Sequence, residues 1–230
     1  MRTDASLPTM VRLPDAFCWT RFGPEAGQSS SAILVRKEQE RIAHDGLFLW
    51  GIGNALGPSI RHLIEVVASP QVLFSPIKSV PRPEDLRPAS VVAWTKAQTL
   101  DGTEFLLPAR CLVISRQDMA AQKKVHYALV CHSSVSLLDR QSGGQLYLGT
   151  LRNLLSGNPV GASQVTAVVR AEPSQFVQGH PYEITLSAQL IPPYFIRLLQ
   201  PLPIGDPSNL DPRWLGQFWR DVVHSLPPIS

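Results

Sequence analysis

Apolar and polar residues follow one another along this chain in short runs, and turn-forming residues separate the runs. Segments 16–21 and 47–52 are apolar, aromatic and bounded by aspartate or glycine, which is typical of strands. Between them, segment 28–44 has helical spacing. Serines at its start can cap free amide groups, and the Asp-Gly pair at 45–46 can end it. The pattern therefore predicts a strand, a helix and a second strand in this order.

Charged and apolar residues are mixed in the predicted helix. By the 3.6-residue period, one of its faces carries four residues: Val35, Glu38, Gln39 and Ile42. A polar residue on that face either points into a site or is shielded by its neighbours. Arg36 and Glu40 have the spacing of a helix-supporting ion pair. We therefore expect most of the charge on this helix to face solvent.

Proline and glycine divide the rest of the chain into short segments, and 21 of the 230 residues are proline. A short helix is predicted at 58–67, and Asp101-Gly102 is predicted to be the turn of a hairpin. Pro76 inside the predicted strand 71–80 indicates an edge or a bulge, because proline cannot donate to the ladder. Other predicted strands are 91–98, 104–114, 125–138, 165–170, 182–190 and 194–199, and 145–155 is predicted to run from a strand into a short helix.

A final helix is predicted to begin at Asp211, with Pro212 at its first position. Its apolar face carries five residues: Trp214, Leu215, Phe218, Trp219 and Val222. Many short strands and few helices predict an α+β fold built on a curved sheet or a small β-barrel. The expected organisation is an extended arm at 1–14, a core at 15–116, a β-rich region at 117–205 that packs on the core or completes it, and a C-terminal helix and tail at 206–230.

The composition is that of a globular protein, with 44% hydrophobic and 17% charged residues. A net charge of +3 permits nucleic-acid binding through a local basic patch, without predicting a long phosphate-binding surface. Cys18, Cys111 and Cys131 match no disulfide framework or zinc spacing, which favours buried reduced thiols. The chain shows no signal peptide and no apolar run of membrane-spanning length, so we expect a cytoplasmic protein without a membrane partner.

Motifs of known enzyme classes give no support for catalysis. The glycine-rich segment 51–57 has the wrong final spacing for a dinucleotide-binding loop, and no suitably placed acidic residue follows it. His126, Cys131 and His132 are the nearest approach to a reactive cluster. Cys131 and His132 should point to opposite faces of a strand, so ordinary sheet residues are the favoured interpretation. An enzyme that uses these three residues stays an alternative.

Tryptophans give the better signal. Trp19, Trp50 and Trp94 each lie in a predicted strand beside polar or glycine residues. Aromatic faces stack on nucleobases with a gain of about 1–3 kcal/mol per base, although burial in a core is the more common role of any one tryptophan. Trp19 and Trp50 form the best pair, because the helix between them brings their strands into one neighbourhood. Two such rings would form a slot for a planar ligand.

The order of an aromatic strand, a charged helix (RKEQER, 36–41) and the segment 46–51 (GLFLWG) resembles the opening of PUA-like barrels, particularly their EVE and YTH branch. The resemblance covers residues 16–116. It implies a small curved-sheet barrel with a pocket that accepts a chemically modified base of DNA or RNA between aromatic side chains. Trp50 matches the pocket tryptophan after the helix best, ahead of Trp19 and Phe74.

Together these observations predict a non-enzymatic module that reads a modified nucleobase, as the recognition component of a bacterial defence or modification-dependent restriction system. Its expected partners are DNA or RNA with a modified base and an effector protein; no cofactor or metal is expected. The predicted base-binding residues are Trp19, Trp50, Asn54, Phe74, Ser75 and Trp94, and the predicted phosphate-binding residues are Arg36, Lys78 and Arg116. The main alternative is a protein-interaction subunit, which predicts exposed apolar patches and a filled interior.

Overall fold

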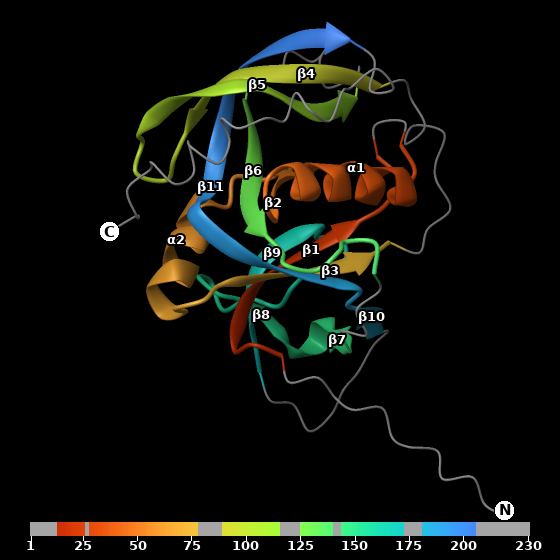
Figure 1. The fold of residues 1–230 in the computed structure, drawn as a ribbon. Coiled ribbons are helices and arrows are strands. Elements are labelled where there is room, and N and C mark those ends of the chain that lie inside the picture. The colour runs from red at the N-terminus through yellow and green to blue at the C-terminus, as the bar shows by residue number, and fades with distance from the viewer. Residues whose placement is uncertain are drawn as a thin grey trace, which may run out of the picture.

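The computed structural model describes residues 13–25, 28–77, 89–115, 125–139, 144–172 and 181–205. They form an α+β fold in which a mixed, curved sheet carries two α-helices (Figure 1). The predicted opening is confirmed as β1 (Ala16–Phe22), α1 (Ser30–Ala43) and β2 (Leu47–Ile52). Within the described residues, neither helix combines the length and apolar character that crossing a bilayer requires.

The remaining elements follow the predicted pattern in part, and the predicted strand 125–138 ends at His132. In chain order they are α2 (Gly57–Val66), β3 (Gln71–Pro76), β4 (Ala89–Gln98), β5 (Glu104–Ser115), β6 (Val125–His132), β7 (Gln145–Tyr147), the 3-10 helix η2 (Leu148–Thr150), β8 (Leu151–Asn153), β9 (Thr166–Ala171), β10 (Pro181–Glu183) and β11 (Leu186–Gly205). The predicted hairpin is confirmed by the antiparallel pairing of β4 with β5, and Gly102 adopts a φ of 91° in its turn. The C-terminal helix predicted from Asp211 and the Lys78 and Arg116 positions lie outside the described residues.

The main sheet has the strand order β2-β6-β11-β3-β1-β9-β8, and β4 joins it by pairing with both β11 and β5. β1 and β3 are parallel neighbours, so α1, β2 and α2 form the connection that crosses between them. The hydrogen-bonded path begins at β2 and ends at β8, and the described strands do not close into a barrel. The α+β class and the curved sheet are thus confirmed, whereas the closed small barrel is not formed by these strands.

Strong curvature of the sheet is evident from contacts between strands that are not neighbours. β6 and β11 lie between β2 and β3 in the strand order. Nevertheless the ring of Trp50 on β2 lies 4.8 Å, centroid to centroid, from the ring of Phe74 on β3. The concave side of the sheet is therefore narrow enough for side chains from β2 and β3 to meet across it.

β11 is one strand of 20 residues where the sequence predicts two separate strands. It pairs with β3 at its start, with β6 in its middle and with β4 at its end. The register against β6 shifts between Leu190 and Phe195, on either side of the two prolines 192 and 193. Prolines cannot donate to a ladder, which explains both the local irregularity and the prediction of a break there.

The two faces of the sheet bury separate apolar clusters. The concave cluster includes residues of β1, β2, β3 and β6 together with Ile60 and Leu63 of α2, and Ile33 and Leu34 of α1 pack against it. The convex cluster includes Phe17 and Trp19 of β1, Leu73 of β3 and residues of the 146–184 region. Both helices therefore cover the concave side, and the segment containing β7 and β8 covers the other side (Figure 1).

The edge position predicted for the strand containing Pro76 is wrong. β3 lies inside the sheet, between β11 and β1. Its register with β11 covers Gln71 to Phe74, so Pro76 lies beyond that ladder, at the end of the strand opposite Phe22. A proline that ends a strand removes no donor that β11 requires, so it is tolerated in an interior strand.

Candidate functional site

The two tryptophans predicted to share a slot lie on opposite faces of the sheet. Trp19 is fully buried in the convex cluster, whereas Trp50 belongs to the concave cluster. Trp19 Nε1 donates a 3.0 Å hydrogen bond to the buried Ser75 Oγ, and its ring makes an edge contact with Tyr182 at 5.4 Å. The predicted shared slot is therefore not present. Trp19 and Ser75 pair with each other on the convex side, away from Trp50.

Trp50 lies in an aromatic cluster drawn from three strands. Phe74 of β3 is 4.8 Å from its ring centroid and Phe22 of β1 is 6.0 Å from it, both in edge-to-face geometry. Trp50 and Phe22 retain 6% and 7% exposure, so the rings are closely packed. The structure thus brings together Trp50 and Phe74 of the predicted site and adds Phe22, which the sequence analysis did not assign. Phe22 lies four residues after Cys18 in β1, so both side chains point to the concave face. This spacing is the sequence signal that could have identified Phe22.

The Phe22–Trp50–Phe74 cluster lies where two parallel strands end. Phe22 closes β1 opposite Pro76, and Ile77 N donates to Phe22 O at 2.7 Å just beyond β3. The cluster therefore lies at the carboxyl ends of the one parallel pair among the described strands.

The other predicted residues lie apart from this cluster or are described only in part. Asn54 is exposed just after β2. Arg36 is half-buried on α1, with Nε 3.4 Å from Gln28 Oε1. Trp94 lies in β4 opposite Arg110 and Pro201, and its side chain is outside the described part of the chain. The ligand contacts predicted for these residues stay predictions.

α1 carries a buried ion pair on its inner side, where the sequence pattern predicts solvated charge. Lys37 and Glu40 are 3% and 5% exposed, and Lys37 Nζ lies 2.6 Å from Glu40 Oε2. The other oxygen, Glu40 Oε1, accepts a 2.8 Å hydrogen bond from the amide of Leu49 in β2. β2 ends the strand order, so this carboxylate satisfies an amide that has no neighbouring strand. Burial lowers the pKa of Lys37, and the adjacent Glu40 carboxylate partly offsets that effect.

A second buried carboxylate joins α1 to the segment after β6. Glu38 accepts two hydrogen bonds of 2.8 Å from the Arg41 guanidinium, one on each carboxylate oxygen, and a third of 2.9 Å from Leu137 N. Arg41 also lies 3.4 Å from Ser133 O. The hydrogen bonds from Arg41 are the main cause that lowers the pKa of Glu38 to about 2. Burial opposes this effect, and the hydrogen bond from Leu137 N adds to it. Glu38 is thus shielded by its neighbours, one of the two roles predicted for it.

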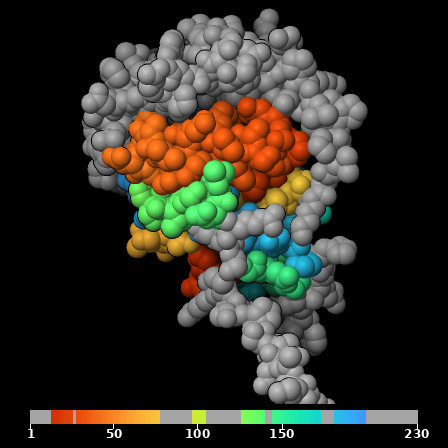
Figure 2. Space-filling model, turned by 45° about the vertical axis from the view of Figure 1, so that its right-hand side comes forward, coloured from red at the N-terminus to blue at the C-terminus, as the bar shows by residue number. Residues whose placement is uncertain are grey.

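Two apolar residues of the same helix face outward, although Ile33 and Leu34 pack against the concave cluster. Val35 and Ile42 are 44% and 64% exposed, one turn before and one turn after Glu38. Val135 and Leu138, in the segment that Glu38 holds, are also exposed. Figure 2 shows α1 in orange beside this green segment on one face of the molecule. The expectation of a solvated charged face on α1 is therefore wrong, because the charges find partners on β2 and on the 133–138 segment.

The candidate reactive cluster does not have the properties of a nucleophilic site. Cys131 is buried in the concave cluster, and desolvation raises its pKa well above the ordinary value. Burial likewise raises the pKa of Cys18 to about 12. A thiolate is the reactive form of cysteine, and both sites disfavour it. His132 is the neighbour of Cys131 in a strand, so it points to the other face. Within the described ranges, no three His, Cys, Asp or Glu side chains are grouped to hold a metal ion.

Comparison with known proteins adds no relative to these observations: no family model, curated protein or solved structure matches the chain. The fold and the side-chain geometry therefore carry the functional argument.

Proposed function

We propose that this protein is a non-enzymatic module that binds nucleic acid and reads a modified nucleobase at the Phe22–Trp50–Phe74 cluster. The observation that carries the proposal is the gathering of three aromatic rings from β1, β2 and β3 where the parallel strands β1 and β3 end. The strand–helix–strand order and the curved sheet support the proposal, which takes the PUA-like resemblance of residues 16–116 as its premise. A role in a bacterial defence or modification-dependent restriction system, with a separate effector, belongs to the same proposal.

The base would stack on Trp50. In the structure Phe22 and Phe74 meet Trp50 edge to face, so stacking requires Phe22 or Trp50 to rotate away and open one ring face. A flipped base carries an unpaired hydrogen-bonding edge, and readers of such bases bond to that edge. Asn54, exposed just beyond β2, offers an amide for this purpose. Ser75 is removed from the proposed pocket, because its hydroxyl accepts the Trp19 hydrogen bond on the opposite face.

The phosphate contacts remain as proposed for Arg36, Lys78 and Arg116. Phosphate contacts carry no sequence information. Removal of any of these charges should therefore weaken binding to modified and unmodified oligonucleotides alike, whereas removal of Trp50 should act on the modified ligand.

The decisive experiment measures binding of a panel of modified and unmodified oligonucleotides by fluorescence anisotropy, with paired variants of the two buried tryptophans. Trp50→Ala removes a core aromatic and should cost about 3–5 kcal/mol of folding free energy, so Trp50→Phe is the better probe. We expect Trp50→Phe to weaken binding of the modified ligand by about 1 kcal/mol, the lower end of a base-stacking contribution.

Trp19→Phe is the matched control. It removes a buried indole and its hydrogen bond to Ser75 on the other face of the sheet, so it should leave ligand affinity unchanged. Equal and negligible binding across the whole panel by the wild-type protein would disprove the proposal. Equal losses in the two variants would show that the affinity follows general stability and not the Trp50 cluster.

A protein-interaction subunit is the second candidate, and the exposed apolar side chains of α1 and the 133–138 segment favour it. Val35, Ile42, Val135 and Leu138 are all at least 44% exposed. Such a surface can pair with its own copy about a two-fold axis. Sedimentation over a concentration series tests this: the second candidate predicts a dimer that Ile42→Asp makes monomeric, and a monomer at every concentration would exclude self-association. The enzyme alternative has the least support, because the burial of Cys131 opposes the thiolate that it needs.

A further inference from the structure

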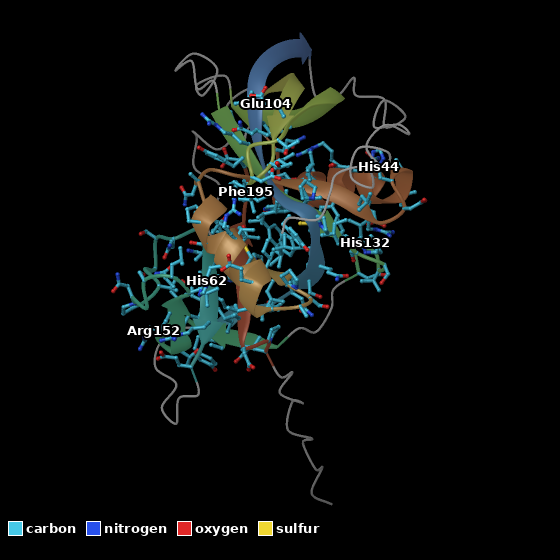
Figure 3. The ribbon with its side chains drawn as sticks, turned by 90° about the vertical axis from the view of Figure 1, so that its left-hand side faces the viewer. His44, His62, Glu104, His132, Arg152 and Phe195 are labelled. Carbon is cyan, nitrogen blue, oxygen red and sulfur yellow. The ribbon has the colours of Figure 1, made fainter. Side chains whose placement is uncertain are left out.

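An open pocket of about 400 Å³ lies on the outer side of α2. Five of its lining residues belong to α2, and the other two are leucines from the β4–β5 turn and from the turn after β8. The lining is made by Gly57, Pro58, Arg61, His62, Glu65, Leu100 and Leu155. In Figure 3, α2 faces the viewer with His62 on its near side. Ile60 and Leu63, on the inner side of the same helix, pack in the concave cluster with Trp50, so this pocket is separate from the aromatic cluster.

We propose that the α2 pocket binds a phosphorylated small molecule whose remaining part is apolar or aromatic. The size falls within the range of small-molecule sites, about 300–1,000 Å³. The lining supplies both parts of such a ligand with a partner: cationic and polar groups on α2, and apolar walls from Pro58, Leu100 and Leu155.

Arg61 is the principal phosphate donor of the proposed site. Its NH2 group donates a 2.7 Å hydrogen bond to Leu100 O, which joins α2 to the β4–β5 turn. This bond fixes the planar guanidinium and leaves other N–H groups of the side chain for a ligand. A guanidinium held in this way matches phosphate oxygens in a bidentate geometry.

The start of α2 adds to the positive potential around Arg61. Its N-cap residue, Leu56, makes no side-chain capping bond, and the first turn contains no acidic residue. The positive end of the helix dipole is therefore not neutralised by the helix itself. This contribution is secondary to Arg61, because the helix end supplies a potential and Arg61 supplies directed donors.

His62 and Glu65 set the sign of the ligand that the pocket accepts. His62 Nδ1 lies 3.3 Å from Glu65 Oε2, and Glu65 is the more exposed of the two. When the imidazole is protonated, its Nε2 can donate to a phosphate. The Glu65 carboxylate repels an anion and attracts a cation. Removal of the Glu65 charge should therefore strengthen the binding of an anionic ligand and weaken the binding of a cationic one.

The experiment titrates the full-length protein with inorganic phosphate, adenosine, adenosine monophosphate and an unmodified single-stranded oligonucleotide, by isothermal titration calorimetry. We expect adenosine monophosphate to bind at least about tenfold more tightly than inorganic phosphate or adenosine, because only it fills both parts of the pocket. Arg61→Gln should weaken it about tenfold, and Glu65→Gln should tighten it about threefold. Tighter binding of the oligonucleotide than of the mononucleotide would identify a backbone phosphate as the source of the group.

Arg170→Gln is the control, since Arg170 is an exposed arginine that pairs with Glu172 and does not line the pocket. It should leave the affinity unchanged. The proposal is overturned if none of the probes binds, if Arg170→Gln weakens binding as much as Arg61→Gln, or if Glu65→Gln weakens binding. Melting temperatures of the variants show whether loss of the Arg61–Leu100 bond has altered the fold. Glu65→Gln keeps the test valid in that case, because its expected effect is a gain.

Discussion

The two helices that cover the concave face solve the same packing problem in opposite ways. α2 buries apolar Ile60 and Leu63 and exposes Glu65. α1 buries Lys37, Glu38 and Glu40, and it exposes Val35 and Ile42. A helix on a sheet ordinarily turns its apolar stripe inward, as α2 does.

The difference between the helices follows from what lies beneath each of them. α2 lies over apolar side chains of the concave cluster. α1 lies beside an edge strand and an irregular segment, where backbone amides have no strand partner. Glu40 accepts from Leu49 N, and Glu38 accepts from Leu137 N. Buried backbone donors require acceptors, so carboxylates on α1 stabilise this arrangement where apolar side chains would leave amides unpaired.

The largest effect that tests this comparison is expected from Glu40→Gln. The amide oxygen of glutamine can still accept from Leu49 N, but the buried Lys37 ammonium loses its carboxylate. Removal of one partner of a buried pair typically costs about 3–5 kcal/mol. Urea unfolding at pH 7 measures the loss. The same substitution at the exposed Glu65 of α2 should change stability by less than about 0.5 kcal/mol.

Alkaline pH and a double variant sharpen this prediction. Burial lowers the folded-state pKa of Lys37, so the unfolded chain binds the proton more readily. The stability of Glu40→Gln should therefore rise as pH increases toward 10.5, the ordinary pKa of lysine. Lys37→Met combined with Glu40→Gln removes the charge altogether and should recover most of the loss. A double variant as unstable as the single one would show that the ion pair is not the cause.

On α2, Leu63→Ala is expected to cost about 2–5 kcal/mol, because Leu63 is fully buried in the concave cluster. Ile42→Ala on α1 replaces an equally apolar residue that is 64% exposed, and it should change the folding free energy by less than about 0.5 kcal/mol. Thermal unfolding of both variants measures the difference. Similar losses would mean that the apolar residues of α1 are covered in solution.

The sequence pattern predicts local elements of this fold better than their pairing. The strand–helix–strand opening, α2 and the β4–β5 hairpin depend on caps, turns and spacing within a few residues. The place of β3 inside the sheet and the continuity of β11 depend on residues more than 100 positions apart, such as Val72 and Ala188. Pro76 and the prolines near 192 are correct signs of local irregularity, but they do not specify which strand lies alongside.

The candidate site shows the same limit. The pattern of β1 can tell that Trp19 and Phe22 face opposite ways, but it cannot tell which of them shares a face with Trp50. That depends on the order of the five strands from β2 to β1 and on their curvature. The burial of Glu38 could not be inferred from its helix either, because its partner amide at Leu137 is 99 residues away. The pocket on α2 likewise combines residues from α2, from the β4–β5 turn and from the turn after β8.

Acid pH should weaken the carboxylate contacts of α1, and the expected loss of stability is intermediate in size. The pKa of Glu38 is about 2 in the folded protein, against an ordinary glutamate pKa of 4.5. Its contribution to stability is therefore present above about pH 5 and is lost as pH falls through 4.5 toward 2. The difference corresponds to at most about 3 kcal/mol. Glu38→Gln should therefore lower stability at pH 7 and match the wild type near pH 2. A constant difference at every pH, measured by urea unfolding, would assign the loss to packing.

The smallest effect concerns how each helix begins. Ser29 caps α1 by accepting a 3.2 Å hydrogen bond from Ala32 N, whereas Leu56 gives α2 no such bond. Ser29→Ala should therefore cost about 1 kcal/mol, the usual value of a lost N-cap. Gln39→Ala is the control: the residue is exposed on the same helix and lies away from its first turn, and alanine favours the helix, so stability should be unchanged or slightly higher. Urea unfolding compares the two variants, and hydrogen exchange of the Ala32 amide locates the change. Faster exchange at Ala32 with unchanged global stability would mean that the first turn of α1 opens on its own, and that the carboxylates of Glu38 and Glu40, not the cap, hold this helix on the sheet.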